Sequence, residues 1–273
     1  MISDKVLIEE NVKRHDEVAE TYDDRHKEIY NPTEQKRLQK ELDQAFSEVK
    51  STSPRILDFG SGTGNLTEKL LPFGKEVWAT DVSSRMLDVV ARKNPSYVEM
   101  EKLKFAQLAG DFPLPFPDNH FAFIATYSVL HHVPDYLEAV RELCRVLDKG
   151  GVLYIDHELN ENYWHPSIAL RVYRGVNAPI YASGRIVART KAFFGFPEEI
   201  QNYDEILEEG DIHVFPDDHI DWDEINSIAI ENGLKILPSE NYLLCRETSD
   251  FPLRHHFFSL FLNDTGIYVG RKE

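Results

Sequence analysis

The sequence predicts an α/β fold in which a mostly parallel sheet carries helices on both faces, giving three layers. One observation carries this prediction. Between Arg55 and Glu158, short β-rich segments alternate with segments that have apolar residues at helical spacing. Each βαβ unit of this kind places two strands in the same direction, with the connecting helix packed on one face. The 273 residues are enough for one large domain or for a core domain with a sizeable insertion.

The elements follow in a regular order until about residue 159. Residues 1–50 are polar with helical spacing, and they are interrupted at Asn31-Pro32. Three helices are expected at 65–73, 84–92 and 135–147, the second capped by Ser83 and Ser84 and the third ended by Gly150 and Gly151. Five strands are expected, at 55–59, 75–81, 103–109, 120–130 and 152–158.

The pattern changes in the C-terminal part of the chain. Residues 160–215 are aromatic and mixed, and we interpret them as a helical insertion over the sheet edge. An amphipathic helix over 220–233 follows, ended by Gly233. Two final strands are expected within 234–244 and 266–272, whereas residues 251–262 are ambiguous between helix and strand.

Composition and charge restrict the partners that the chain can have. Its formal net charge is −17, so nucleic acid and anionic membrane surfaces are poor partners. No apolar run approaches membrane-spanning length, and the N-terminus lacks the apolar core of a signal peptide. The two cysteines, Cys144 and Cys245, lie far apart without metal-like spacing, which fits a reducing cytoplasm. The oligomeric state is left open.

The stretch RILDFGSGTGN, residues 55–65, indicates a ligand site. Glycines at 60, 62 and 64 lie between a predicted strand and a predicted helix, where glycine allows positive φ and close backbone approach to a ligand. Dinucleotide enzymes use G-x-G-x-x-G, whereas the spacing here is G-x-G-x-G. Asp58 is awkward beside a pyrophosphate but suits a ligand with an ammonium group. Asp81, at the end of the second strand, could accept hydrogen bonds from ribose hydroxyls.

With these residues the sequence resembles the class I S-adenosylmethionine-dependent methyltransferases, from about Arg55 to His157 and more loosely over 219–271. Five motifs occur in order: LDFGSGTGN, ATDVSSRML, AGDFPLPFPDNHF, SVLHHVPD and the strand after LDKGG. The similarity is greatest to small-molecule methyltransferases, including the quinone-biosynthesis type. The resemblance implies a Rossmann-like sheet of seven strands with an antiparallel last strand, and S-adenosylmethionine as the cofactor. The segment 160–215 matches no family pattern.

The resemblance also implies a set of cofactor contacts. Asp58, Gly60 and Gly62 would contact the amino-acid end, and Asp81 would contact the ribose. Met86 would pack on the adenine, whose edge Asp111 and Phe112 would hold. The stretch 17–26 is similar to the helix that covers the cofactor, and places Tyr22 near the methionine end. The complete predicted set is Tyr22, Asp58, Gly60, Ser61, Gly62, Gly64, Asp81, Val82, Met86, Gly110, Asp111, Phe112 and Ser128.

The sequence indicates fewer residues for the site of the methyl acceptor than for the cofactor. His131 and His132 follow the fourth strand and could take a proton from an acceptor, or they could instead orient the loop. The aromatic residues of the insertion could line a pocket for the acceptor, or they could form the core of the insertion itself. The acidic run at 217–219 is interpreted as solvated, and no metal site is predicted. The candidate substrate residues are His157, Trp164, Tyr173 and Phe193.

The chain is thus expected to be an S-adenosylmethionine-dependent methyltransferase that acts on a small molecule by in-line displacement. Two alternatives remain, a protein that binds the cofactor without methyl transfer and a nicotinamide-dependent oxidoreductase. The sequence does not show whether oxygen, nitrogen or carbon accepts the methyl group. Four parts are expected: a helical cap over 1–50, a cofactor-binding core over 51–159, an insertion covering the acceptor site over 160–215, and the rest of the core sheet over 216–273.

Overall fold

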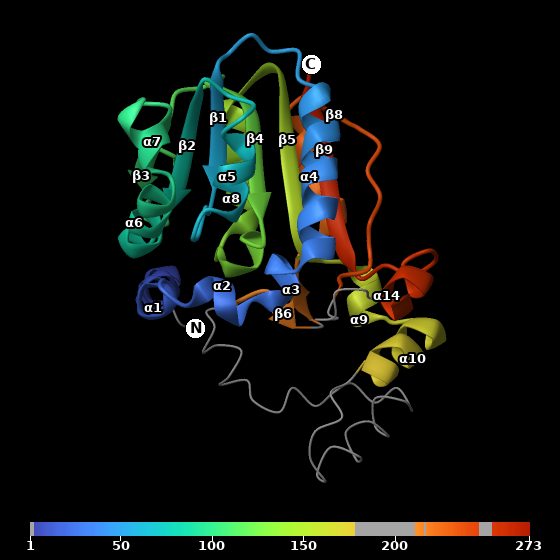
Figure 1. Cartoon of the computed structure of the whole chain (residues 1–273). Helices are drawn as coiled ribbons and strands as arrows, with labels where there is room; N and C mark the ends of the chain where they lie inside the picture. Colours follow the sequence, from blue (N-terminus) through green and yellow to red (C-terminus); the bar gives the residue numbers. More distant parts are fainter. Residues whose placement is uncertain (1–2, 178–210, 216, 246–252) are drawn as a thin grey trace.

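A seven-stranded sheet forms the middle layer of the molecule in a computed structural model that describes residues 3–177, 211–215, 217–245 and 253–273 (Figure 1). The strand order is β3-β2-β1-β4-β5-β9-β8. The strands are β1 (Arg55–Phe59), β2 (Glu76–Asp81), β3 (Leu103–Gln107), β4 (Phe121–Tyr127), β5 (Leu147–Leu159), β8 (Leu234–Ile236) and β9 (Thr265–Lys272). A separate pair, β6 (Val214–Phe215) and β7 (Asp218–His219), is antiparallel.

The pairing confirms the predicted sheet. Strands β3, β2, β1, β4 and β5 are parallel, and β9 is antiparallel to both of its neighbours, β5 and β8. The chain moves outward from β1 to β3 and then crosses back to β4 on the other side of β1. In open α/β sheets, ligands bind at the carboxyl ends of the strands on either side of such a reversal. The place expected for a site is therefore the end of β1 and β4.

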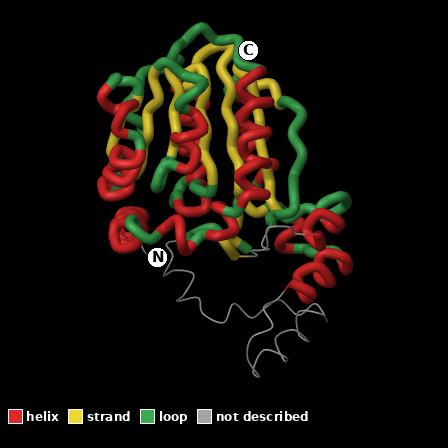
Figure 2. Tube along the Cα trace, in the orientation of Figure 1, coloured by secondary structure: helices red, strands yellow, loops and turns green. Residues whose placement is uncertain are grey.

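Helices cover both faces of the sheet (Figure 2). Alternate strand residues enter opposite cores, so that Ile56 packs with α4 and α5 whereas Leu57 packs with α8 and α13. The helices that flank the sheet are α4 (Pro32–Ser47), α5 (Asn65–Leu70), α6 (Ser84–Lys93), α7 (Pro95–Glu99), α8 (Tyr136–Val146) and α13 (Trp222–Glu231). This burial of both faces explains why the strands read as short continuous apolar runs.

A further group of elements lies across the carboxyl ends of the strands (Figure 1). It comprises α1 (Asp4–Val18), α2 (Tyr22–Arg25), α3 (Lys27–Tyr30), the 3-10 turn η1 (Leu130–His132), α9 (Glu161–Trp164), α10 (Ile168–Asn177) and α14 (Leu253–Phe258). None of the helices in the described residues is long and apolar enough to cross a membrane.

Some boundaries differ from the prediction. Strand β5 begins at Leu147, so LDKGG is part of the strand and does not only end a helix. The strand expected within 234–244 extends only over Leu234–Ile236. The ambiguous stretch 251–262 contains a helix, α14, in its described part. The insertion is helical in α9 and α10, while 178–210 lies outside the described residues.

Candidate active site

A cavity opens at the carboxyl ends of β1, β2 and β4, beneath α1 and α2. Its wall combines the glycine turn after β1, the end of β2, the loop after β3 and the start of η1. Ten of the thirteen predicted cofactor residues line it, namely Tyr22, Gly60, Ser61, Gly62, Asp81, Val82, Gly110, Asp111, Phe112 and Ser128. The predicted motifs, separate in the sequence, thus meet at one place.

The glycine turn is held against β2 by its backbone. The N–H groups of Gly60 and Ser61 both donate to the carbonyl of Thr80, at 2.9 and 2.8 Å. A Cβ on Gly60 would lie 2.5 Å from the methyl groups of Val129, whereas a Cβ on Gly62 would meet nothing within 4 Å. Both residues have positive φ, +74° and +49°. Gly60 is therefore required by packing, while the space beside Gly62 is open to a ligand.

Asp81 fixes this turn from the next strand. Its carboxylate accepts hydrogen bonds from the backbone N–H groups of Gly62 at 2.9 Å and Ser83 at 2.8 Å. Burial raises the pKa of Asp81, and the hydrogen bonds from Ser83 and Gly62 oppose that rise. Asp81 also lines the cavity, so its carboxylate is placed to accept from a ligand as well.

The N-terminal helices cover the cavity. Helix α1 places Ile8 against the loop after β3, where a Cβ on Gly110 would lie only 2.7 Å from the Ile8 side chain. Asn11 and His15, one turn apart on α1, also line the cavity, and the ring nitrogen Nδ1 of His15 lies 2.9 Å from the carbonyl oxygen of Asn11. The sequence analysis missed Ile8, Asn11 and His15. The helical spacing placed them on a helix, but no motif showed that this helix crosses the site.

Three predicted cofactor residues do not line the cavity. Asp58 is fully buried, and one oxygen of its carboxylate accepts a hydrogen bond from the hydroxyl of Thr67 at 2.5 Å. Burial raises the pKa of Asp58 to about 7. Met86 is fully buried beside Ala19 and Val89. Gly64, with φ +100°, is the N-cap of α5.

The two predicted catalytic histidines have different surroundings. His132 lines the cavity, whereas His131 does not. Nδ1 of His131 lies 2.6 Å from a carboxylate oxygen of Glu158, which also accepts the N–H groups of Val129 and Leu130 at 2.8 Å. Burial alone would lower the pKa of His131, but Glu158 and Asp211 outweigh it and raise the pKa to about 9. A histidine already charged at neutral pH is a poor general base, so the prediction of a proton acceptor applies better to His132.

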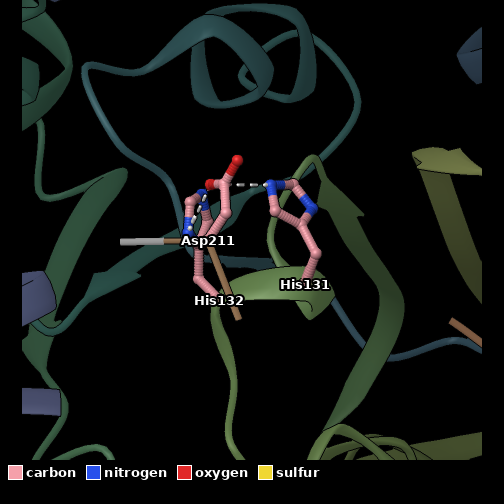
Figure 3. A group of neighbouring side chains, drawn as sticks. All are labelled: His131, His132 and Asp211. Atoms are coloured by element: carbon pink, nitrogen blue, oxygen red, sulfur yellow. Dashed lines mark ion pairs between the residues drawn. The ribbon is translucent and has the colours of Figure 1, made fainter. Parts of the chain in front are cut away.

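Asp211 joins the two histidines, and the sequence analysis did not identify it. Its carboxylate lies 3.2 Å from Nδ1 of His132 and 3.7 Å from Nε2 of His131 (Figure 3). The backbone holds Asp211 there, because the N–H groups of Ile212 and His213 both donate to the carbonyl of His131, at 2.9 and 3.1 Å. A lone aspartate at the end of an unclassified segment carries no pattern, so no signal in the sequence pointed to it.

The predicted substrate residues are not brought together. His157 is half-buried and stacks on Tyr127, with 4.6 Å between ring centroids. Trp164 lies beside His219, and Tyr173 is buried among Leu170, Leu243 and Phe258. None of these three predicted residues lines the cavity. Phe193 lies outside the described residues. For Tyr173 the structure therefore supports the alternative interpretation, a core residue of the insertion.

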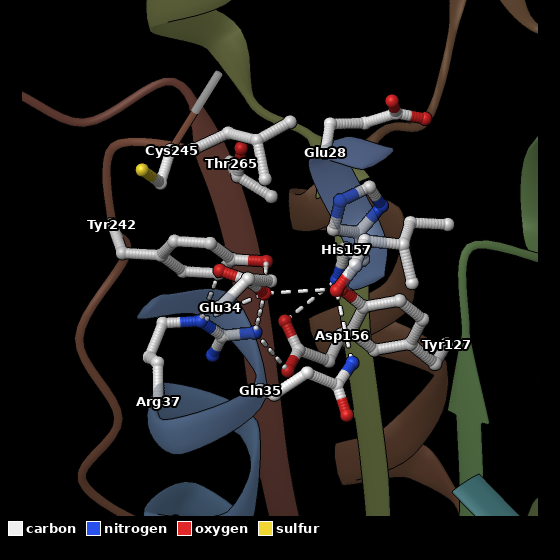
Figure 4. A network of polar contacts seen from close by, with 12 residues as sticks. Glu28, Glu34, Gln35, Arg37, Tyr127, Asp156, His157, Tyr242, Cys245 and Thr265 are labelled. Atoms are coloured by element: carbon white, nitrogen blue, oxygen red, sulfur yellow. Dashed lines mark hydrogen bonds and ion pairs between the residues drawn. The ribbon is translucent and has the colours of Figure 1, made fainter. Parts of the chain in front are cut away.

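A buried polar network fixes the β4–β5 side of the site (Figure 4). Arg37 donates to the carboxylates of Glu34 and Asp156 at 2.5 and 2.8 Å, and its guanidinium lies 3.6 Å from the centroid of the Tyr242 ring. The hydroxyl of Tyr127 donates to Glu34 at 3.0 Å. Because Tyr127 also lines the cavity, this network connects helix α4 to the cavity wall.

Comparison with known proteins agrees with this site. Residues 57–155 match the family model described as a methyltransferase domain. The chain is 33% identical over 112 residues to an uncharacterized methyltransferase of Bacillus subtilis, covering 40% of this chain and 42% of that protein. It is 33% identical over 104 residues to a ubiquinone/menaquinone biosynthesis C-methyltransferase of Laribacter hongkongensis, covering 37% and 41%. It thus spans about two fifths of the length of these relatives.

A solved structure extends the likeness of the fold to nearly the whole chain. The N-methyltransferase NodS of Bradyrhizobium japonicum, in complex with S-adenosyl-L-homocysteine, superposes with a TM-score of 0.55 at 16% identity, covering 96% of this chain and 98% of that one. At this identity the match concerns the fold alone. Residues 57–155 therefore belong to the methyltransferase domain family, and the fold around them is that of the solved methyltransferase structure.

Proposed function

We propose that the chain binds S-adenosylmethionine in the cavity and transfers its methyl group to a small-molecule acceptor. The observation that carries this proposal is the convergence of the glycine turn, Asp81 and the loop 110–112 around one cavity. The fit is supported by the open space beside Gly62, where a ligand can approach the backbone closely.

Each part of the wall suits one part of the cofactor. Ser61 and Ser128 offer hydroxyl groups to the amino-acid end, beside the turn that Gly60 forms. The carboxylate of Asp81 can accept from the two ribose hydroxyls. Val82, Asp111 and Phe112 provide an apolar face and a polar edge for the adenine. All of these residues line the cavity.

The protein contributes alignment and exclusion of water. When bound, the cofactor supplies a methyl group already activated by its attachment to a sulfonium. Helices α1 and α2 cover the cavity with Ile8 and Tyr22, which keeps the reacting groups from bulk water. His132 faces the cavity and can take a proton from an acceptor that must lose one, whereas His131 orients the turn through Glu158.

Several finer points belong to the same proposal. A small-molecule acceptor is supported by relatives named as quinone-biosynthesis C-methyltransferases. The division into a cap over 1–50, a core over 51–159 and 216–273, and an acceptor-covering insertion over 160–215 is supported by the position of α1, α2, α9 and α10 at the ligand end of the sheet. A cytoplasmic location is supported by Cys144 and Cys245, which are buried and not joined in a disulfide.

Calorimetric titration tests the cofactor. The protein should bind S-adenosylmethionine and not NADH, and Gly62→Arg should abolish binding because its side chain would enter the open space. Asp81→Ala should weaken binding. Transfer of a labelled methyl group to a panel of phenols, amines and quinols then tests the reaction. No binding of S-adenosylmethionine would overturn the proposal, binding of NADH alone would favour an oxidoreductase, and binding without transfer to any acceptor would favour a binding protein.

A further inference from the structure

Three side chains converge beside the cavity, and the proposed methyl transfer gives no role to one of them, Asp211. His131, His132 and Asp211 each present one donor atom, and these atoms lie within 4.8 Å of one another (Figure 3). The side chains are only 15%, 17% and 22% exposed, so they do not form an ordinary solvated surface group. Two imidazoles and one carboxylate are a common ligand set for divalent first-row metals.

Glu158, the carboxylate beside His131, is placed to orient a metal-binding histidine. Nδ1 of His131 lies 2.6 Å from Glu158, which leaves Nε2 facing Asp211. Glu158 is 1% exposed and is held in place by the backbone N–H groups of Val129 and Leu130. A histidine that binds a metal through one nitrogen commonly donates its other N–H to such a carboxylate, which fixes the ring.

The charges around the cluster favour a cation. Glu158 and Asp211 are two carboxylates in a partly desolvated place, and within the described residues their recorded ion pairs are with histidines alone. Two carboxylates with two neutral imidazoles carry a charge that one divalent ion would balance.

We propose that His131, His132 and Asp211 bind one divalent transition-metal ion. Three protein ligands leave coordination positions open. Because His132 also lines the cavity, those positions can be reached from it. This inference rests on the proposed function for its role: the site would select acceptors that carry an oxygen able to bind the ion. An acceptor hydroxyl bound to the ion would lose its proton to water more readily. Its oxygen then forms the new bond to the methyl carbon, while the carbon–sulfur bond breaks and the sulfur keeps the electron pair.

Metal binding is measured on the full chain without S-adenosylmethionine. After treatment with a chelator, the protein is titrated with MnCl₂ while free Mn²⁺ is followed by electron paramagnetic resonance. We expect one Mn²⁺ per chain and at least about tenfold weaker binding by Asp211→Asn, since even losing an outer partner of a ligand costs about 10- to 100-fold. Asp218→Asn is the matched control, because Asp218 pairs with His213 two residues beyond Asp211 but lies outside the cluster. Its affinity should equal that of the wild type.

A second measurement does not depend on how the variants fold. Pulsed resonance of the Mn²⁺-loaded wild type should show coupling to imidazole nitrogen. Absence of binding by the wild type, equal affinity in Asp211→Asn, or no nitrogen coupling would each overturn the metal site. A separate titration of the wild type with S-adenosylmethionine distinguishes the two proposals. A protein that binds Mn²⁺ but does not bind S-adenosylmethionine contradicts only the proposed function. A protein that binds S-adenosylmethionine but does not bind Mn²⁺ contradicts only the metal site.

Discussion

The carboxylate of Asp81 accepts a hydrogen bond from the backbone N–H of Gly62 at 2.9 Å, although 19 positions separate the two residues in the chain. The contact forms because β1 and β2 are parallel neighbours, so that both carboxyl ends meet at the same edge of the sheet. It joins the glycine turn to the acidic residue that is expected to hold a ribose. The shape of the turn and the position of the acid therefore depend on each other.

Replacing Asp81 by Asn should weaken S-adenosylmethionine binding by about tenfold to a hundredfold. The change removes a charged acceptor, whose hydrogen bonds contribute about 1.5–3 kcal/mol each, and places an amide donor against backbone N–H groups. Calorimetric titration measures the loss. Asp88→Asn is the control, because Asp88 is a nearby aspartate in α6 whose side chain is exposed. An affinity unchanged in Asp81→Asn would remove this residue from the site.

Alanine at Gly60 and at Gly62 should have different effects. Both residues have positive φ, so each variant loses about 1–2 kcal/mol of stability from left-handed backbone strain. Only Gly60→Ala also places its Cβ 2.5 Å from Val129, so its melting temperature should fall further. Gly62→Leu should keep the stability of Gly62→Ala while losing ligand binding. Thermal unfolding and titration measure the two effects, and equal melting temperatures for both alanine variants would contradict the packing argument.

The stability of the protein should depend on pH through Asp58. Burial raises the pKa of Asp58 to about 7, from 3.8 for an ordinary aspartate, with the hydrogen bond from Thr67 opposing the rise and the charge of Asp81 adding to it. Between about pH 4 and pH 7 the folded state keeps a proton that the unfolded state has lost, so this group makes the protein less stable as pH rises.

The Asp58→Asn variant isolates this contribution. The free energy of unfolding of this variant, relative to that of the wild type, should increase as pH rises from 4.5 to 7, because the amide does not titrate. Urea unfolding at several pH values gives the difference between the two proteins. A difference that stays constant over this range would show that the pKa of Asp58 is not raised.

Replacing Arg37 by Met should destabilise the fold by about 3–5 kcal/mol, because Glu34 and Asp156 would remain buried without their common partner. Arg92→Met is the control, since Arg92 pairs with Glu20, whose side chain is 76% exposed, and such pairs contribute about 0–1 kcal/mol. Chemical unfolding compares the two variants. Similar losses would mean that the Arg37 network contributes no more than a surface pair.

Residues next to the ends of strands were predicted more accurately than the directions of buried side chains. The glycine turn, Asp81 and the loop at 110–112 were predicted because each lies next to a strand end, and the strands themselves carry clear periodicity. Asp58 and Met86 were expected to contact the ligand directly, and in the structure both side chains are fully buried and do not line the cavity. Residue spacing fixes the backbone path of a turn, but it does not show which way a buried side chain points.

The amino-acid sequence by itself determined the alternating strands and helices, because these follow from periodicity. Its short motifs carried the resemblance to a methyltransferase family, and that resemblance implied the antiparallel last strand. Only the tertiary structure decided which distant groups meet. It brought Ile8 and His15 of α1 over the cavity, separated the environments of the two adjacent histidines, and placed Asp211 against both. These contacts depend on how whole elements pack across the end of the sheet, and packing over such separations leaves no periodic signal in the chain.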